Sequence, residues 1–146
     1  MRGSLGDAME TAFGGEVRQP MFRAMKAEAD GSPKVGRSSR ELGVRIDGPT
    51  RDLTIGPDGM VEPRTGGMSV ALDALQNLPK PRLPRSLGGE GRDPVFTLFT
   101  AAIPRSLFVR PDRYPHALVE PSRRCSLRDF ESDLASTRSL WSRAYD

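Results

Sequence analysis

The sequence predicts a single α+β domain with short strands, long connections and one amphipathic helix near its C-terminal end. Short runs of apolar, β-branched and aromatic residues recur along the chain between prolines and glycines, which is typical of strands. Glycine and proline, with 15 and 13 residues, are frequent enough to predict a loop-rich fold. Close to the C terminus the apolar residues take the spacing of a helix instead.

The 146 residues have the length of one domain, and they suffice for a hydrophobic core without disulfides. Residues 1–20 contain several glycines and little apolar periodicity, and the Ala8–Phe13 piece within them is too short to predict a helix. We therefore expect a flexible N-terminal arm over residues 1–20 and one domain over residues 21–146.

The first strand is expected at Met21–Met25, where apolar residues alternate about Arg23. On this pattern alone, Arg23 is a solvent-facing strand residue. After a loop over Ala29–Arg40, two brief strands are predicted at Leu42–Ile46 and Leu53–Ile55, with the turn sequence Asp-Gly-Pro-Thr between them.

A central stretch, residues 58–70, combines a short apolar run, a proline that should end it, and a turn rich in glycine and hydroxyls. Gly66 and Gly67 let the backbone turn tightly and approach a ligand closely, and Ser69 suits the N-cap of a following helix. The free N–H groups and hydroxyls of such a turn, that of Thr65 included, suit a phosphate or a ribose. An ordinary loop that starts a helix has the same composition.

The next segment, Val70–Leu78, has one apolar face and is predicted to be a short helix that Pro79 ends. The connection over Lys80–Asp93 contains two prolines and three glycines, and loops of that length inside a compact domain are often mobile covers or binding elements. Three proline-bounded apolar runs then predict strands at Val95–Ala102, Leu107–Val109 and His116–Val119.

The clearest helix follows Ser126, which can cap it together with Asp129 three residues later. Its apolar residues recur on about one face and extend almost to the C terminus: Leu127, Phe130, Leu134, Trp141 and Ala144.

His116 is the only histidine, and it opens an apolar strand between Arg113-Tyr114 and Glu120. A lone histidine at such a place is usually a structural hydrogen-bonding group. The alternative is a titratable group in a site with polar neighbours.

Composition and motifs exclude several classes of protein. One cysteine excludes an internal disulfide and fits a reducing compartment, and with a single histidine no structural zinc site is expected. P-loop, GxGxxG, HExxH and Ser-His-Asp patterns are missing, and so are a long apolar run and a signal peptide. The net charge of +3, carried mainly by arginine, suits an acidic or phosphorylated partner, although scattered arginines favour an ordinary solvated surface over a nucleic-acid stripe.

Four short motifs in order are similar to one toxin family. Residues 58–63 (Asp-Gly-Met-Val-Glu-Pro) and 65–70 (Thr-Gly-Gly-Met-Ser-Val) correspond to the family's Asp-Gly-Leu-Tyr-Ala-Pro and Thr-Gly-Gly-Thr-Ser-Val. Residues 21–24 (Met-Phe-Arg-Ala) and 116–121 (His-Ala-Leu-Val-Glu-Pro) are similar to its Leu-Tyr-Arg-Ala and His-Tyr-Thr-Ile-Met-Pro. Over about residues 22–144, the chain thus resembles the second exported effector of the type VI secretion system of pseudomonads, a small bacterial toxin.

This resemblance implies an ADP-ribosyltransferase-like fold, in which two small β-sheets form a central cleft with a few short helices, and NAD as the co-substrate. Arg23 would hold the phosphates or the adenosine ribose of NAD, and Thr65 and Ser69 would hold the nicotinamide ribose. Gly66 and Gly67 would give close backbone approach, and His116 would orient the ribose or nicotinamide. We expect Arg23, Thr65 and His116, and the motifs that contain them, to converge on one pocket.

The chain also departs from the family pattern. Met68 stands where the family has Thr, so one hydroxyl is missing. The acidic residue that many ADP-ribosyltransferases use is not identifiable, because Glu120 stands where the family has Met.

The resemblance further implies synthesis in a bacterial cytoplasm, export by a type VI secretion system without a signal peptide, and action in the cytoplasm of the recipient cell. The expected partners are a secretion-machine component, an acidic cognate immunity protein and a target macromolecule that the sequence does not identify, with no membrane. Two alternatives remain: an RNA-directed basic module, and an enzyme that transfers a phosphate from RNA to NAD on the same scaffold.

Overall fold

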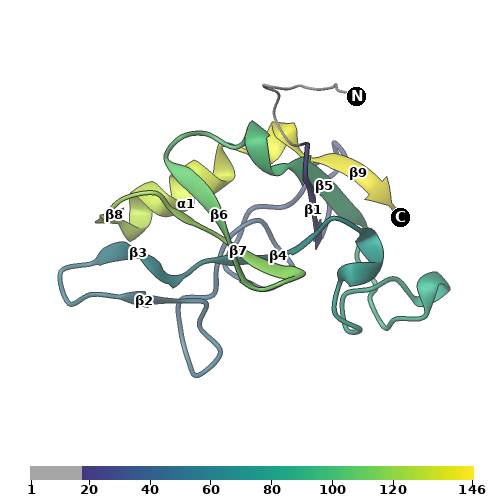
Figure 1. Ribbon diagram of the computed structural model, residues 1–146, viewed down its shortest axis with the longest axis horizontal. Helices are drawn as coiled ribbons and strands as arrows, with labels where there is room; N and C mark the ends of the chain where they lie inside the picture. Colours follow the sequence, from purple (N-terminus) through teal and green to yellow (C-terminus); the bar gives the residue numbers. More distant parts are fainter. Residues whose placement is uncertain (1–17) are drawn as a thin grey trace, which may run out of the picture.

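The computed structural model describes residues 18–146, so the expected Ala8–Phe13 piece and most of the expected arm lie outside the described residues (Figure 1). These residues form two antiparallel sheets and one α-helix, α1, over Leu127–Ala135. Short 3-10 helices occur at Leu75–Asn77, Arg85–Leu87, Thr100–Ala102 and Arg138–Leu140. This arrangement confirms the predicted α+β class, with two sheets and few short helices.

The large sheet has six strands in the order β6-β7-β4-β1-β5-β9. Its strands are β1 (Pro20–Ala24), β4 (Met68–Leu72), β5 (Val95–Phe99), β6 (Leu107–Arg113), β7 (His116–Pro121) and β9 (Ser142–Tyr145). The small sheet has the order β2-β3-β8, formed by β2 (Leu53–Ile55), β3 (Met60–Gly66) and β8 (Cys125–Ser126). The main core includes residues of both sheets and of α1, among them Met21, Val61, Phe96, Phe130 and Trp141.

The chain crosses from the small sheet to the large sheet at Gly66 and Gly67. A Cβ at Gly67 would lie 2.2 Å from the carbonyl oxygen of Val119, and one at Gly66 would lie 2.1 Å from that of Asp52. Gly66 also has a φ of +130°, which favours glycine. The two glycines are therefore needed for contact between backbone segments of the protein itself.

Beside this crossing, β1 and β4 pair only at Met21–Leu72 and Phe22–Ala71. Beyond these two pairs no further register is formed, whereas β1 pairs with β5 along its whole length. The two central strands of the sheet therefore separate near Arg23 and Ser69.

The predicted helix over Val70–Leu78 is wrong. Met68–Leu72 is strand β4, paired with both β7 and β1, and only a 3-10 turn follows at Leu75–Asn77. Ser69 accordingly caps no helix. Tertiary pairing overrides the helical spacing here, because Val70, Ala71 and Leu72 are all buried in the sheet.

The prediction that Pro63 ends the central apolar run is wrong, because Pro63 lies inside β3. The β2–β3 register shifts between Leu53 and Ile55, opposite this part of β3. A proline is tolerated at such an irregularity because the ladder hydrogen bond that it cannot donate is already interrupted.

The predicted strand at Leu42–Ile46 is also wrong, although Leu42 and Val44 are buried. Leu42 forms only an isolated bridge with Val35. The carbonyls of Glu41 and Gly43 accept hydrogen bonds from the Arg23 side chain instead of from a neighbouring strand.

The predicted strands at Met21–Met25 and Leu53–Ile55 are present as β1 and β2. Those at Val95, Leu107 and His116 are present as β5, β6 and β7, except that the first gives way to a 3-10 turn after Phe99. The Ser126 cap is confirmed, since its hydroxyl accepts the Asp129 N–H at 3.0 Å.

Helix α1 is shorter than predicted, because it ends at Ala135. Phe130 and Leu134 form its buried face. Trp141 follows the helix and is still 94% buried, since its exposed fraction is 6%, whereas Ala144 lies in β9, which pairs with β5. The late apolar residues belong to the core and the sheet edge, not to one long helix.

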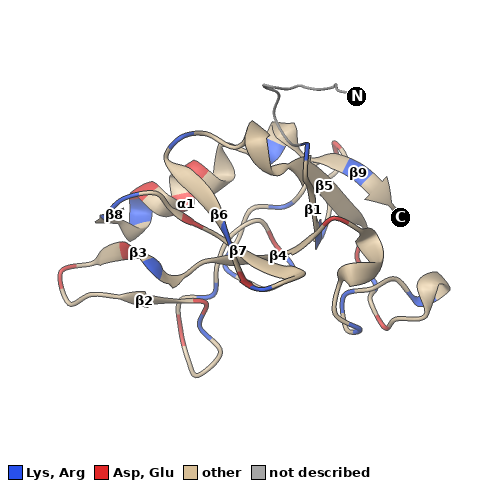
Figure 2. Ribbon diagram, viewed as in Figure 1, with Lys and Arg blue, Asp and Glu red and all other residues tan. Residues whose placement is uncertain are grey.

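Basic and acidic residues are interspersed over most of the ribbon (Figure 2). Many pair across elements: Arg37 with Glu131, Arg40 with Asp93, Arg45 with Asp52 and Arg110 with Glu120. Among the described residues, no helix has the length and hydropathy that a membrane span requires.

Candidate functional site

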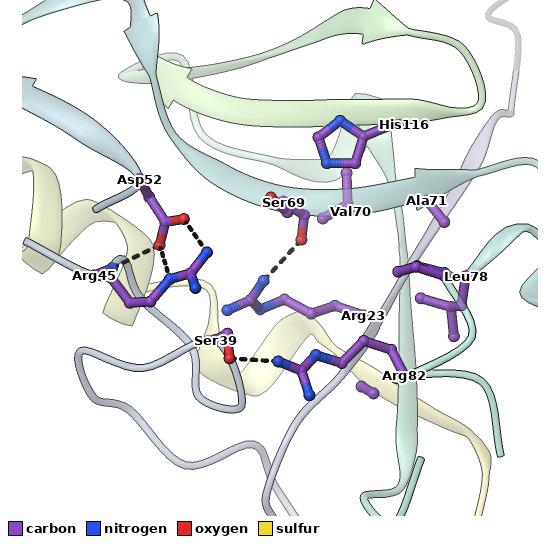
Figure 3. Close-up of a pocket in the computed structure, with 12 residues that line it drawn as sticks. Arg23, Ser39, Arg45, Asp52, Ser69, Val70, Ala71, Leu78, Arg82 and His116 are labelled. Atoms are coloured by element: carbon purple, nitrogen blue, oxygen red, sulfur yellow. Dashed lines mark hydrogen bonds and ion pairs between the residues drawn. The ribbon is translucent and has the colours of Figure 1, made fainter. Parts of the chain in front are cut away.

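A pocket of about 200 Å³ opens where β1 and β4 separate (Figure 3). Arg23 and Ala24 come from β1, and Ser69, Val70 and Ala71 come from β4. The other lining residues are Ser39, Arg45, Asp52, Leu78, Pro79, Arg82 and His116.

Arg23 is buried, with an exposed fraction of 6%, so the expectation of a solvent-facing residue is wrong. Its Nη1 donates to the Ser69 carbonyl at 2.8 Å, and its Nε and Nη2 donate to the Glu41 carbonyl at 3.2 and 2.7 Å. The Nη2 atom also lies 3.4 Å from the carbonyl oxygens of Ser38 and Gly43. The side chain thus joins the 38–43 loop to β4 across the gap between the central strands.

Burial lowers the pKa of Arg23 to about 10, an effect that Asp52 opposes and that Arg82 and Arg45 increase. The guanidinium is therefore still charged at neutral pH. Since it has five N–H groups and only one acceptor is recorded for Nη1 within residues 18–146, one hydrogen of this nitrogen remains for a ligand.

Arg45 and Asp52 form a closed ion pair on the pocket wall. The Arg45 Nη2 and Nε donate to the Asp52 carboxylate at 2.8 and 3.3 Å, and the Arg45 backbone N–H donates at 2.6 Å. This bond to Asp52, together with its charge, raises the pKa of Arg45 despite burial. The Asp52 carboxylate therefore neutralises Arg45 and leaves the other pocket arginines without a carboxylate from this wall.

Arg82 enters the pocket from the long 80–93 connection. Its Nη2 donates to the Ser39 hydroxyl at 2.5 Å, and no carboxylate pairs with it within residues 18–146. Three guanidinium groups, of Arg23, Arg45 and Arg82, thus face a pocket that contains one carboxylate. The excess positive charge favours an anionic ligand.

The lining also has an apolar part. It consists of Ala24, Val70, Ala71 and Leu78, which are all buried. A planar ring can pack against apolar side chains while the arginines of the same pocket contact an anion.

A second hollow of about 250 Å³ adjoins the pocket and shares Ala24 and Arg82 with it. Its wall includes the Arg40–Asp93 pair and Arg92. Ligand sites usually span about 300–1,000 Å³, so the first pocket alone lies below this range, and the second hollow continues it.

His116 stands on the rim of the pocket, on β7 opposite Ala71. Its Nδ1 lies 2.6 Å from the Asp112 carboxylate. Figure 3 shows the ring over Ser69 and Val70, with one nitrogen on the side of Arg23 and the other directed away. Arg23 and His116, which 93 positions separate in the sequence, therefore share one pocket.

The other predicted site residues lie differently. Ser69 contributes its carbonyl, which Arg23 binds. Thr65 is exposed at the end of β3, where its hydroxyl donates to the Glu62 carbonyl at 2.8 Å. Thr65 lines a separate open hollow that shares only Asp52 with the pocket, so the expected convergence of Thr65 with Arg23 and His116 is not observed, and the central motif reaches the pocket through Ser69.

Gly66 and Gly67 are not among the lining residues of the pocket. The close backbone approach expected of them exists, but it is toward Asp52 and Val119 and not toward the pocket.

Glu120, the acidic residue that stands where the family has Met, is fully buried and lies outside the pocket. Its carboxylate accepts hydrogen bonds from Arg110 at 2.9 and 2.5 Å and from the Arg64 N–H at 2.7 Å. Arg64 has a φ of +65°, a conformation that non-glycine residues rarely adopt. Glu120 thus stabilises the end of β3 and has no direct access to a ligand in the pocket.

Sequence reasoning missed Arg45, Asp52 and Arg82. Each lies in or next to a loop without a motif, and only the tertiary fold brings it to the pocket. The length of the 80–93 connection was the one available signal for Arg82. Within residues 18–146, no three His, Cys, Asp or Glu side chains are grouped as metal ligands.

One comparison with known proteins identifies a family for the chain. No curated protein matches the chain. A family model described as the Tse2 ADP-ribosyltransferase toxin matches residues 20–141, which begin at β1 and include all the residues of the pocket. Because this match covers most of the chain and its fold is of the ADP-ribosyltransferase type, the protein belongs to the family of Tse2 ADP-ribosyltransferase toxins.

Proposed function

We propose that this toxin transfers ADP-ribose from NAD to a macromolecule of the cell that it enters, and that the pocket between β1 and β4 binds NAD. One observation carries the proposal: the lining of one pocket combines apolar side chains with three guanidinium groups and a single carboxylate. NAD combines a planar ring with a pyrophosphate and two riboses, so the apolar side chains suit its ring and the guanidinium groups suit its pyrophosphate.

The family membership supports NAD as the co-substrate, because ADP-ribosyltransferases take their ADP-ribose unit from it. When bound, NAD supplies this unit, with nicotinamide as the leaving group. The residues of the chain provide binding and orientation: Ala24 and Val70 support the ring, Arg82 and the free Nη1 hydrogen of Arg23 hold the phosphates, and His116 contacts a ribose hydroxyl.

The small size of the pocket supports a ligand that continues into the neighbouring hollow. Arg82 stands at the boundary between the two hollows and is the only arginine that lines both among the described residues. It is therefore the residue best placed to bind a central pyrophosphate. Thr65 stands outside the pocket, so the proposal gives it no contact with NAD there.

The test is NAD binding by the purified chain, measured by calorimetry and by the thermal shift that a bound ligand produces. We expect Arg82→Gln to weaken binding about 10- to 100-fold, since a hydrogen bond to a charged group contributes about 1.5–3 kcal/mol. Arg85→Gln is the matched control, because Arg85 is three residues away on the same connection, is exposed and lines neither hollow.

Release of nicotinamide from NAD by the wild-type chain, lost in Arg82→Gln, would support the enzymatic step. If NAD neither binds nor stabilises the chain, while RNA binds with an affinity that falls steeply with salt, the RNA-directed alternative replaces this proposal.

We also propose, from the resemblance of the sequence, that the toxin is made in a bacterial cytoplasm, exported by a type VI secretion system and active in the recipient cytoplasm. An acidic immunity protein would then protect the producing cell. Growth arrest on expression of the chain, relieved by co-expression of the neighbouring small open reading frame, is the expected result. An arrest that this reading frame does not relieve argues against the immunity partner.

A further inference from the structure

The proposed function gives His116 a contact with NAD but gives no role to Asp112, whose carboxylate contacts the histidine ring. Asp112 lies in β6 and His116 starts β7, and the Oδ1 of the former is 2.6 Å from the Nδ1 of the latter. The two side chains are 27% and 34% exposed, so neither is fully solvated. The Arg113 N–H also donates to the same Asp112 oxygen at 2.9 Å. The carboxylate is thus fixed from two sides.

Among the described residues, no other charged side chain has a recorded contact with the ring. On β6, Arg113 is exposed and is the register partner of His116. Beyond β4, Asp73 accepts hydrogen bonds from the hydroxyl of Tyr114 and from the amide of Gln19. Across the pocket, Arg45 pairs with Asp52, while Arg23 and Arg82 bond to a carbonyl and to a hydroxyl. Among the described residues, Asp112 is therefore the carboxylate that contacts the imidazole.

A neutral imidazole carries one N–H, and the hydrogen bond at one nitrogen decides which nitrogen has it. A carboxylate only accepts hydrogen bonds, so the Nδ1 beside Asp112 must be the protonated nitrogen. Nε2 then has a free lone pair. No hydrogen bond to Nε2 is recorded within residues 18–146, and the ring nitrogen opposite Nδ1 lies on the pocket side (Figure 3).

We infer that Asp112 is a positioning residue, which holds His116 in the tautomer with hydrogen on Nδ1 and so presents Nε2 to the pocket as an acceptor for a ligand hydroxyl. The inference rests on the proposed function for the identity of the ligand, whose ribose is the hydroxyl-bearing part. The tautomer itself depends only on the free protein. Burial raises the pKa of Asp112, but the hydrogen bonds from His116 and from the Arg113 N–H outweigh it, so that the pKa lies below its ordinary value. The carboxylate is therefore present at neutral pH.

The single histidine makes the tautomer measurable, because the full chain gives only one pair of imidazole nitrogen signals. Long-range ¹H–¹⁵N NMR at about pH 9, where an imidazole is neutral, separates a protonated ring nitrogen from one with a lone pair. We expect the protonated nitrogen of the wild-type chain to be Nδ1. In Asp112→Ala the acceptor is gone, and the hydrogen should move largely to Nε2.

Asp47→Asn is the matched control, since Asp47 is exposed and has no hydrogen bond or ion pair recorded among the described residues. It should leave the tautomer unchanged. A wild-type ring protonated at Nε2, or an unchanged tautomer in Asp112→Ala, would overturn the inference whether or not NAD binds.

The functional consequence is tested with NAD. We expect Asp112→Ala to weaken NAD binding or to slow nicotinamide release by about tenfold, the lower end of the effect seen when the outer partner of a metal-bound histidine is removed. In a His116→Ala background the same substitution should have no further effect, because Asp112 acts through the ring. Equal losses in both backgrounds would show that Asp112 has only a structural role. If wild-type NAD binding fails while the tautomer moves as expected, the proposed function is wrong and the positioning role stands.

Discussion

Replacement of Arg23 by methionine should lower the free energy of unfolding of the protein, in addition to any effect on ligand binding. The substitution keeps the apolar part of the side chain and removes the guanidinium group. The carbonyls of Glu41 and Ser69, which now accept hydrogen bonds at 2.7 to 3.2 Å, would lose their donors in a partly buried place.

The magnitude follows from these bonds. Three hydrogen bonds from a charged donor, at about 1.5 kcal/mol each, together stabilise the fold by about 4–5 kcal/mol. Methionine avoids the desolvation cost of burying the guanidinium, which offsets part of this loss. We expect a net loss of about 3 kcal/mol in the free energy of unfolding. For a chain of this length that loss lowers the melting temperature by about 6–12 °C.

Urea unfolding followed by the fluorescence of Trp141 is the appropriate assay, because this single tryptophan is buried in the main core. Arg128→Met is the control: Arg128 is exposed on α1 and has no partner recorded among the described residues, so its loss should stay within about 0.5 kcal/mol. Arg23→Lys separates charge from geometry, since an ammonium group cannot reach both carbonyls. A loss below about 1 kcal/mol in Arg23→Met would refute the role of Arg23 as a link between the 38–43 loop and β4.

Three further results are expected. Glu120→Gln should lower the free energy of unfolding by about 2–4 kcal/mol in the same urea assay, because an amide cannot accept hydrogen bonds from both Arg110 and the Arg64 N–H as the buried carboxylate does. A loss near zero would contradict the buried pair. Gly67→Ala should abolish soluble folded protein, judged by yield and circular dichroism, since its Cβ would lie 2.2 Å from the Val119 oxygen; a normally folded variant would mean that the two sheets can move apart. Burial raises the pKa of Asp112, but the hydrogen bonds from His116 and Arg113 outweigh it, so the pKa lies below its unfolded value. The stability advantage of wild type over Asp112→Ala should therefore be complete above about pH 4 and vanish as the pH falls through the folded pKa. A difference in stability that stays constant between pH 6 and pH 2 would contradict this sign.

Local features of the structure were predictable from sequence. Ser126 caps α1 because the acceptor and the N–H that it binds are only three residues apart. The proline-bounded apolar runs at Val95, Leu107 and His116 became strands because their composition and length leave few other ways to bury them.

Features that depend on distant partners were not predictable. Val70–Leu72 has a spacing compatible with a helix, and the choice of strand is made by β1 and β7, which are paired with it from about 50 residues away on either side. The Leu42–Ile46 segment forms no strand, and its Gly43 carbonyl, like the Glu41 carbonyl just before it, accepts a hydrogen bond from the Arg23 side chain of β1.

The candidate site was predictable only in part. Arg23 and His116 were identified by resemblance and share the pocket, whereas Thr65 carries a suitable hydroxyl but stands beyond Asp52. Arg82 lies in a connection whose length suggests a binding element, but nothing in the sequence shows which of its residues adds charge to the pocket.

The crossing at Gly66 and Gly67 affects how genetic screens of this toxin should be interpreted. The two glycines lie within the motif that most resembles the family, yet a side chain at either would collide with the backbone of Asp52 or Val119. Colonies that survive expression of a mutagenised gene would therefore be enriched in substitutions that remove the folded protein from the cell, without any defect in the chemistry of the site. A survivor altered at this crossing identifies a catalytic defect only when its soluble abundance equals that of the parent.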